Sequence, residues 1–140
     1  IDVFFDDGYS KEEMKMVNET RKILHLPNLP VSATCIRVPV PVAHGVLIKV
    51  ELEKPVTPEE AREVLAAYPG IKVLDDPKNH IYPTSTIAAG NDLVYVGRIR
   101  KDLCCENGLL IYCVADNVRK GAAANAVQIV RELIKERENA

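Results

Sequence analysis

Two apolar runs joined by an Asn-Gly turn constrain the fold of this chain more than any other feature. The runs extend from Leu93 to Arg100 and from Gly108 to Ala115, with Asn107 and Gly108 at the turn. Asn-Gly is strongly preferred in tight β-hairpin turns because both residues tolerate a positive φ. The two runs are therefore expected to pair as strands, which places a sheet at the centre of the fold.

Helices are expected to cover this sheet. Ser10 followed by Glu13 is a capping-box pattern, and Pro58 followed by two glutamates is typical of the first turn of a helix. Apolar residues recur at helical spacing in each case and again near the C-terminus. The expected helices run from Ser10 to before Pro27, from Thr57 to about Tyr68, and from about Asn117 to Glu136.

Further strands are expected where apolar residues alternate with polar ones or lie between prolines. These are Val31 to Val38, His44 to Glu53 and Ile71 to Leu74, whereas Asp75 to Ala89 is expected to be a long loop. Consecutive strands with short connections favour a mixed, mostly antiparallel sheet covered by helices. The sequence therefore predicts an α+β fold in which residues 1–140 form a single domain.

Composition excludes several classes of protein. A net charge of −2 argues against a nucleic-acid partner, which would need a basic face. The longest apolar run, from Gly108 to Ala115, is too short to span a membrane. Four cysteines show neither a disulfide framework nor a metal-type spacing, so we expect no metal site and reduced thiols in a cytoplasmic protein.

Arg37 and His44 lie on either side of a proline-bounded turn and are candidate site residues. If the flanking strands folded back as a hairpin, their side chains would approach each other. A half-buried guanidinium would bind a carboxylate through two hydrogen bonds, and an imidazole beside Gly45 could act as an acid or base. A structural arginine pairing and a structural histidine are the more common alternatives.

Two further pairs carry polar groups with equally ordinary alternatives. Glu12 and Lys15 share one face of the first helix, where the usual interpretation is a solvated ion pair of little energetic value. Asp116 and Asn117 precede the last helix and could simply cap it. Cys35 lies in an apolar run, which favours a buried small residue over a nucleophile.

Four segments, in order along the chain, resemble the bacterial aspartate-semialdehyde dehydrogenases. The segment 35–45 resembles the active-site segment of that family, in which an arginine is followed seven residues later by a histidine. The other matching segments are 8–23, 95–100 and 116–123. The resemblance implies the C-terminal domain of a glyceraldehyde-3-phosphate dehydrogenase-like fold, which dimerises through its sheet.

The resemblance also implies a reaction and roles for residues. The family interconverts aspartate semialdehyde and aspartyl phosphate with NADP and inorganic phosphate, in lysine, methionine and threonine biosynthesis. Arg37 would bind the substrate α-carboxylate, Glu12 its amino group and Lys15 the phosphate. His44 would be the general acid/base, and Asn117 would bind the nicotinamide carboxamide.

The chain departs from the family pattern in two respects. It has no Gly-rich dinucleotide loop, and no cysteine follows an asparagine as the nucleophile of the family does. The chain alone is therefore expected to be inactive, because no thiolate attacks the aldehyde. An apolar stripe, Val127, Val130 and Ile134, is expected to lack part of its partner without the nucleotide-binding domain, which predicts an exposed patch, a displaced helix or self-association. A free-standing dimerisation or small-ligand-binding module is the alternative function.

Overall fold

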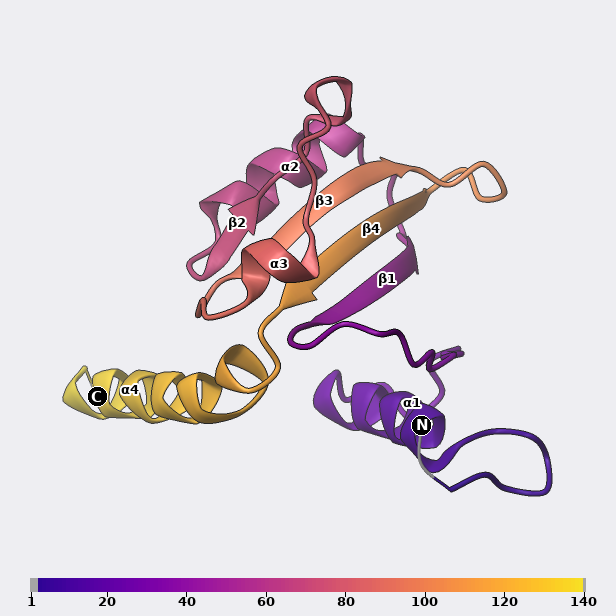
Figure 1. Ribbon diagram of the computed structural model, residues 1–140, viewed down its shortest axis with the longest axis horizontal. Helices are drawn as coiled ribbons and strands as arrows, with labels where there is room; N and C mark the ends of the chain where they lie inside the picture. The colour runs from indigo at the N-terminus through magenta and orange to yellow at the C-terminus, as the bar shows by residue number, and fades with distance from the viewer. Residues whose placement is uncertain (1–2, 140) are drawn as a thin grey trace. The chain divides into compact units, whose positions relative to one another are not determined.

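A computed structural model describes residues 3–139. The chain forms two compact units, Ile1–Pro39 and Val40–Ala140. The first unit contains α1 (Lys11–Ile23), and the second contains a sheet with its covering helices (Figure 1). Within the described residues, no helix is both long and apolar enough to cross a membrane.

The first unit is organised by the cap of α1. The hydroxyl of Ser10 accepts the N–H of Glu13 at 3.2 Å, and the carboxylate of Glu13 accepts the N–H of Ser10 at 2.7 Å. This reciprocal pair is the predicted capping box, which satisfies two of the unpaired donors at the helix start. Val17 is buried on the inner side of the helix.

The strand expected from Val31 to Val38 is wrong. The segment is extended loop without ladder pairing, and the Cys35 N–H donates instead to the Glu13 carboxylate at 2.9 Å. Prolines at both ends, Pro30 and Pro39, provide no N–H for a neighbouring strand. The apolar alternation persists, since Ala33 and Cys35 are partly buried, but it reflects packing within this unit and not a sheet.

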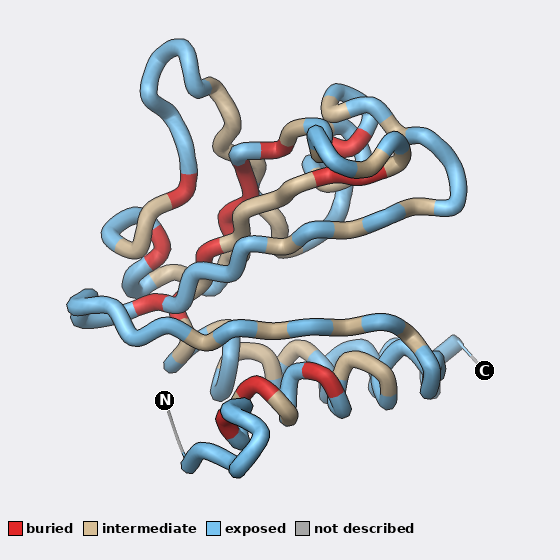
Figure 2. The backbone as a smooth tube through the Cα atoms, turned by 90° about the vertical axis from the view of Figure 1, so that its right-hand side faces the viewer, coloured by how far each residue is buried: buried red, intermediate tan, exposed pale blue. Residues whose placement is uncertain are grey.

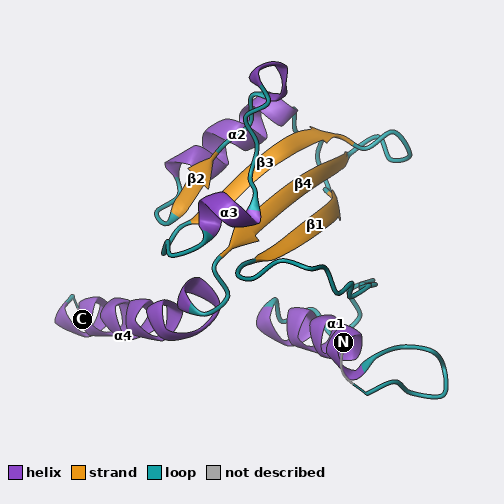
Figure 3. Ribbon diagram, in the orientation of Figure 1, coloured by secondary structure: helices purple, strands orange, loops and turns teal. Residues whose placement is uncertain are grey.

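The second unit is built on a four-stranded mixed sheet of order β1-β4-β3-β2 (Figure 3). β1 pairs antiparallel with β4, β4 antiparallel with β3, and β3 parallel with β2. The strands are β1 (His44–Glu51), β2 (Ile71–Val73), β3 (Val94–Lys101) and β4 (Gly108–Ala115). The predicted α+β class, the four strands in this unit and their mostly antiparallel pairing are confirmed.

Helices cover the two faces of this sheet. α2 (Pro58–Ala67) is capped by Thr57 and Glu60 and packs beside β2 and β3, where Ala61 joins a core cluster with Val96. α3 (Ser85–Ala88) lies over β4, where Ala88 joins a second cluster with Val114. Side chains alternate between the two faces of a strand. The neighbouring β3 residues Tyr95 and Val96 therefore belong to different clusters. Buried positions gather accordingly on the strands and their covering elements (Figure 2).

Two predicted boundaries need correction. The segment from Asp75 to Ala89, expected to be a loop, contains a 3-10 turn (Pro77–Asn79) and α3. Pro77 and the capping side chain of Thr84 provide local start signals that the long polar composition obscures. The last helix begins with a π-helical turn (Arg119–Ala123) before α4 (Ala124–Glu138).

The expected exposure of the apolar stripe on the last helix is confirmed. Val127, Val130 and Ile134 are 50–54% exposed, and Ile129 and Leu133 are similarly uncovered. Exposed apolar stripes of this kind usually mark a surface that another element covers.

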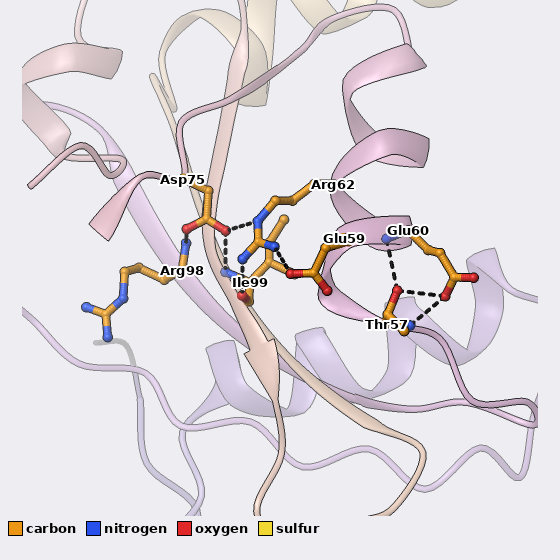
Figure 4. Close-up of polar contacts among 7 residues, drawn as sticks. All are labelled: Thr57, Glu59, Glu60, Arg62, Asp75, Arg98 and Ile99. Carbon is orange, nitrogen blue, oxygen red and sulfur yellow. Dashed lines mark hydrogen bonds and ion pairs between the residues drawn. The ribbon is translucent and has the colours of Figure 1, made fainter. Parts of the chain in front are cut away.

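Asp75 fixes an irregularity in β3 (Figure 4). Its carboxylate accepts the N–H groups of Arg98 at 2.6 Å and Ile99 at 3.1 Å, where the β3–β4 register shifts. Arg62 of α2 donates to the same carboxylate at 2.7 Å and to the Ile99 carbonyl at 2.9 Å. The hydrogen bond to Asp75 raises the pKa of Arg62. Arg98 has a φ of 53°, so the network holds a strained backbone.

Candidate functional site

Glu12 and Lys15 of the first unit lie on α1 as an ion pair. The Lys15 Nζ lies 3.1 Å from a Glu12 carboxylate oxygen, and both side chains are nearly half exposed. The pair is the solvated i,i+3 contact that the sequence predicts, and it contributes at most about 1 kcal/mol to stability.

Glu13 connects this helix to the segment that carries Arg37. One carboxylate oxygen completes the capping box and the other accepts the Cys35 N–H, two residues before Arg37. These backbone hydrogen bonds, first from Ser10 and then from Cys35, lower the pKa of Glu13. The sequence predicted the capping box. It did not predict the hydrogen bond between Glu13 and Cys35, because these residues are 22 positions apart.

Arg37 is exposed, so its predicted half-burial is wrong. It forms no ion pair with any residue that the structure describes. The hairpin that would have brought Arg37 and His44 together is also wrong, because β1 takes β4 as its ladder partner and residues 31–38 form no strand. The guanidinium is thus available to an anion.

His44 opens β1 at the edge of the sheet in the second unit. It is directly opposite Ala115, the last residue of β4, and its side chain is exposed. Among the strands that the structure describes, β1 is the first in the sheet order and has β4 as its one neighbour, so His44 lies at a corner of the sheet.

Ala43, the residue before His44, has an unusual backbone. Its φ is 79°, although it is not glycine, and it is only 4% exposed. This region costs an alanine about 1–2 kcal/mol because Cβ crowds the following carbonyl. The Asn117 side-chain oxygen accepts the Ala43 N–H at 3.1 Å. The structure thus brings the candidate Asn117 to the backbone that precedes the candidate His44.

Asp116, and not Asn117, accepts backbone N–H groups where the chain enters the last helix. Its buried carboxylate accepts the N–H groups of Val118 at 2.9 Å and Arg119 at 3.2 Å, and that of Gly90 at 2.8 Å. These bonds, that from Gly90 first, lower the pKa of Asp116. Asn117 is thereby left free to serve another purpose.

Gly45 follows His44 and lies against Tyr112 of β4. A Cβ at this position would collide with the tyrosine hydroxyl. Glycine at position 45 is therefore explained by the space that the Tyr112 side chain takes up, and not by a turn that needs a positive φ. No cluster of His, Cys, Asp and Glu in residues 3–139 could hold a metal ion.

Gly45→Ala is expected to lower the free energy of unfolding by about 1 kcal/mol, the low end of the usual cost of added volume, because Gly45 is exposed and the colliding atoms are at the end of the Tyr112 side chain. Urea denaturation of the chain measures this loss. The loss should be smaller when Tyr112→Phe removes the hydroxyl that the new methyl meets. An equal loss in both backgrounds would contradict the assigned collision.

Comparison with known proteins places this geometry in a family. The model of the semialdehyde dehydrogenase dimerisation domain matches residues 1–120. Aspartate-semialdehyde dehydrogenase of Aquifex aeolicus is 59% identical over 136 residues, covering 97% of this chain and 40% of that protein. The Bacillus subtilis enzyme of the same name is 46% identical, with 96% of this chain and 39% of that protein covered.

Solved structures agree with the sequence comparison. Aspartate semialdehyde dehydrogenase II from Vibrio cholerae, in a complex with ASA, superposes with a TM-score of 0.89 at 45% identity. The match covers 96% of this chain and 40% of that one, so the chain spans about two fifths of the length of these relatives. The family model covers most of the chain and the superposed fold is the same. The chain belongs to the semialdehyde dehydrogenase dimerisation-domain family.

Proposed function

We propose that this chain is the C-terminal part of an NADP-dependent aspartate-semialdehyde dehydrogenase. The reaction would convert L-aspartate 4-semialdehyde, phosphate and NADP to L-4-aspartyl phosphate and NADPH. The observation that carries the proposal is the 59% identity to the Aquifex aeolicus enzyme across nearly the whole chain. In this proposal, the chain provides the substrate-binding and acid/base groups of the enzyme.

The charges of the first unit suit a zwitterionic substrate and a phosphate. Arg37 is proposed to bind the α-carboxylate, since an exposed guanidinium can form two parallel hydrogen bonds to it. Glu12 would bind the amino group and Lys15 the phosphate. Both side chains are nearly half exposed, which supports this assignment because a ligand can reach their charged groups.

His44 is the proposed general acid/base. Its exposed imidazole would accept the proton of the attacking thiol, which the remainder of the enzyme supplies, and later return a proton. The side-chain nitrogen of Asn117 donates no hydrogen bond to any described residue, which fits a nicotinamide carboxamide oxygen as its acceptor. NADP, when bound, accepts the hydride.

A homodimer through this domain is part of the proposal. The matching family model describes a dimerisation domain. β1 is an edge strand of the sheet within residues 3–139, and Val46 and Leu47 on it are 40% and 62% exposed. Apolar residues on an edge strand are well suited to a contact with a second copy.

A chimera tests the proposed function. Residues 1–140 replace the matching segment of the Aquifex aeolicus enzyme, and NADPH formation is followed with aspartate semialdehyde and phosphate. We expect turnover from the chimera, as from the unmodified relative, and none from the 140-residue chain alone. A folded but inactive chimera would refute the proposal. Calorimetric binding of aspartate or phosphate to the chain would then favour a ligand-binding module, and self-association without such heat a dimerisation module.

A further inference from the structure

We propose that Asn117 is a positioning residue for His44, acting through the backbone of Ala43. The inference rests on the proposed function, because it concerns the acid/base histidine of that reaction. It assigns Asn117 a task that is separate from binding the cofactor. The task belongs to the side-chain oxygen, whereas a carboxamide ligand would use the side-chain nitrogen.

The backbone of Ala43 requires an external support. A φ of 79° is unfavourable for alanine, and its methyl group is buried with Ala88 and Val114. The residue therefore cannot relax toward an ordinary strand conformation without moving this cluster. The hydrogen bond from its N–H to Asn117 Oδ1, at 3.1 Å, is the polar contact that stabilises the unfavourable conformation.

The same contact determines where β1 begins. The β1–β4 ladder ends at the pair His44 and Ala115, and Asn117 follows Ala115 by two residues. Its side-chain oxygen accepts the N–H of Ala43, the residue just before the last backbone pair. The φ of Ala43 sets the direction in which the chain enters His44, so loss of this bond would displace the imidazole.

Asn117 itself is held rigidly enough for this task. The neighbouring Asp116 carboxylate is buried and accepts three backbone N–H groups, one of them from Gly90 before β3. The backbone next to Asn117 is therefore held in place, and the Asn117 side chain is half-buried. Residues that hold strained backbone beside reactive groups commonly contribute to preorganisation.

The first experiment measures the backbone directly, by NMR of the 140-residue chain. In Asn117→Ala, we expect the amide exchange of Ala43 to accelerate by about tenfold, the effect of losing one hydrogen bond. The Cα and Cβ shifts of Ala43 should move toward values for negative φ. Asn117→Asp is the matched control, because its carboxylate still accepts the Ala43 N–H. Unchanged exchange and shifts in Asn117→Ala would overturn the inference.

The second experiment measures catalysis in the chimera. Asn117→Ala is expected to lower kcat on the order of a hundredfold, as small displacements of catalytic groups do. Ala43→Gly should restore part of this loss, since glycine adopts a positive φ without support. Asn117→Asp should retain more of kcat than Asn117→Ala and mainly raise the KM for NADP.

The two proposals fail in different ways. Without the proposed function, the unsubstituted chimera shows no turnover, and the NMR experiment still decides whether Asn117 holds Ala43. If Asn117 serves the cofactor alone, Ala43→Gly gives no rescue, and Asn117→Asp loses as much kcat as Asn117→Ala. That pattern overturns the positioning role and leaves the dehydrogenase assignment intact.

Discussion

Asp75→Ala is expected to lower the free energy of unfolding by about 3 kcal/mol. Removing one partner of a buried ion pair typically costs about 3–5 kcal/mol, because the other charge loses its compensation. The Asp75 side chain is 1% exposed, whereas that of Arg62 is 29% exposed, which favours the lower end of this range. The N–H groups of Arg98 and Ile99 also lose their acceptor. Urea denaturation measures the total loss.

A matched control separates this network from ordinary surface charge. Glu59 also pairs with Arg62, at 3.0 Å, but its side chain is 74% exposed. Glu59→Ala should therefore cost less than about 1 kcal/mol. Asp75→Asn keeps one acceptor oxygen without the charge. Its loss of stability should lie between those of Asp75→Ala and Glu59→Ala. Equal effects of Asp75→Ala and Glu59→Ala would refute the assigned role of Asp75.

Asp75 illustrates what the sequence could not reveal. It lies in a polar segment that local patterns identify as loop, and its partners are 13 to 24 residues away. Its importance arises only when α2 and β3 approach each other. Gly97 gives a second example, since a Cβ there would collide with the Leu74 carbonyl across the parallel pair.

Local signals, in contrast, predicted most of the secondary structure. The capping box at Ser10 forms as expected, the second helix begins at the predicted Pro58, and β4 has the predicted bounds. These features depend on residues within a few positions of one another. The expected strand from Val31 to Val38 failed because strand formation requires a partner, and alternation alone does not provide one.

The candidate site shows the same division. Residue types and order identified Glu12, Lys15, Arg37, His44 and Asn117 as candidates. What the sequence did not show is how they are held. Glu13 accepts the Cys35 N–H, and Ala43 adopts a positive φ against Asn117, and neither fact has a local sequence pattern.

His44→Ala in the chimera is expected to reduce kcat by about 100- to 10,000-fold, the usual contribution of a general acid/base. The imidazole is exposed, so the loss of stability should stay within about 0.5 kcal/mol. His80→Asn is the matched control: it removes an exposed histidine whose φ of 58° asparagine also tolerates. Turnover of His44→Ala close to that of the control would remove the assigned role.

Arg37→Lys should impair the chimera in a different way from His44→Ala. The difference distinguishes substrate binding from proton transfer. Lysine keeps the positive charge but cannot form two parallel hydrogen bonds to a carboxylate. Losing one charge-assisted bond should raise the KM for aspartate semialdehyde by about 10- to 100-fold while kcat changes less. If Arg37→Lys instead lowered kcat as strongly as His44→Ala without raising KM, the guanidinium would act on the transition state. Arg37 would then have to be reassigned from substrate binding to the chemical step.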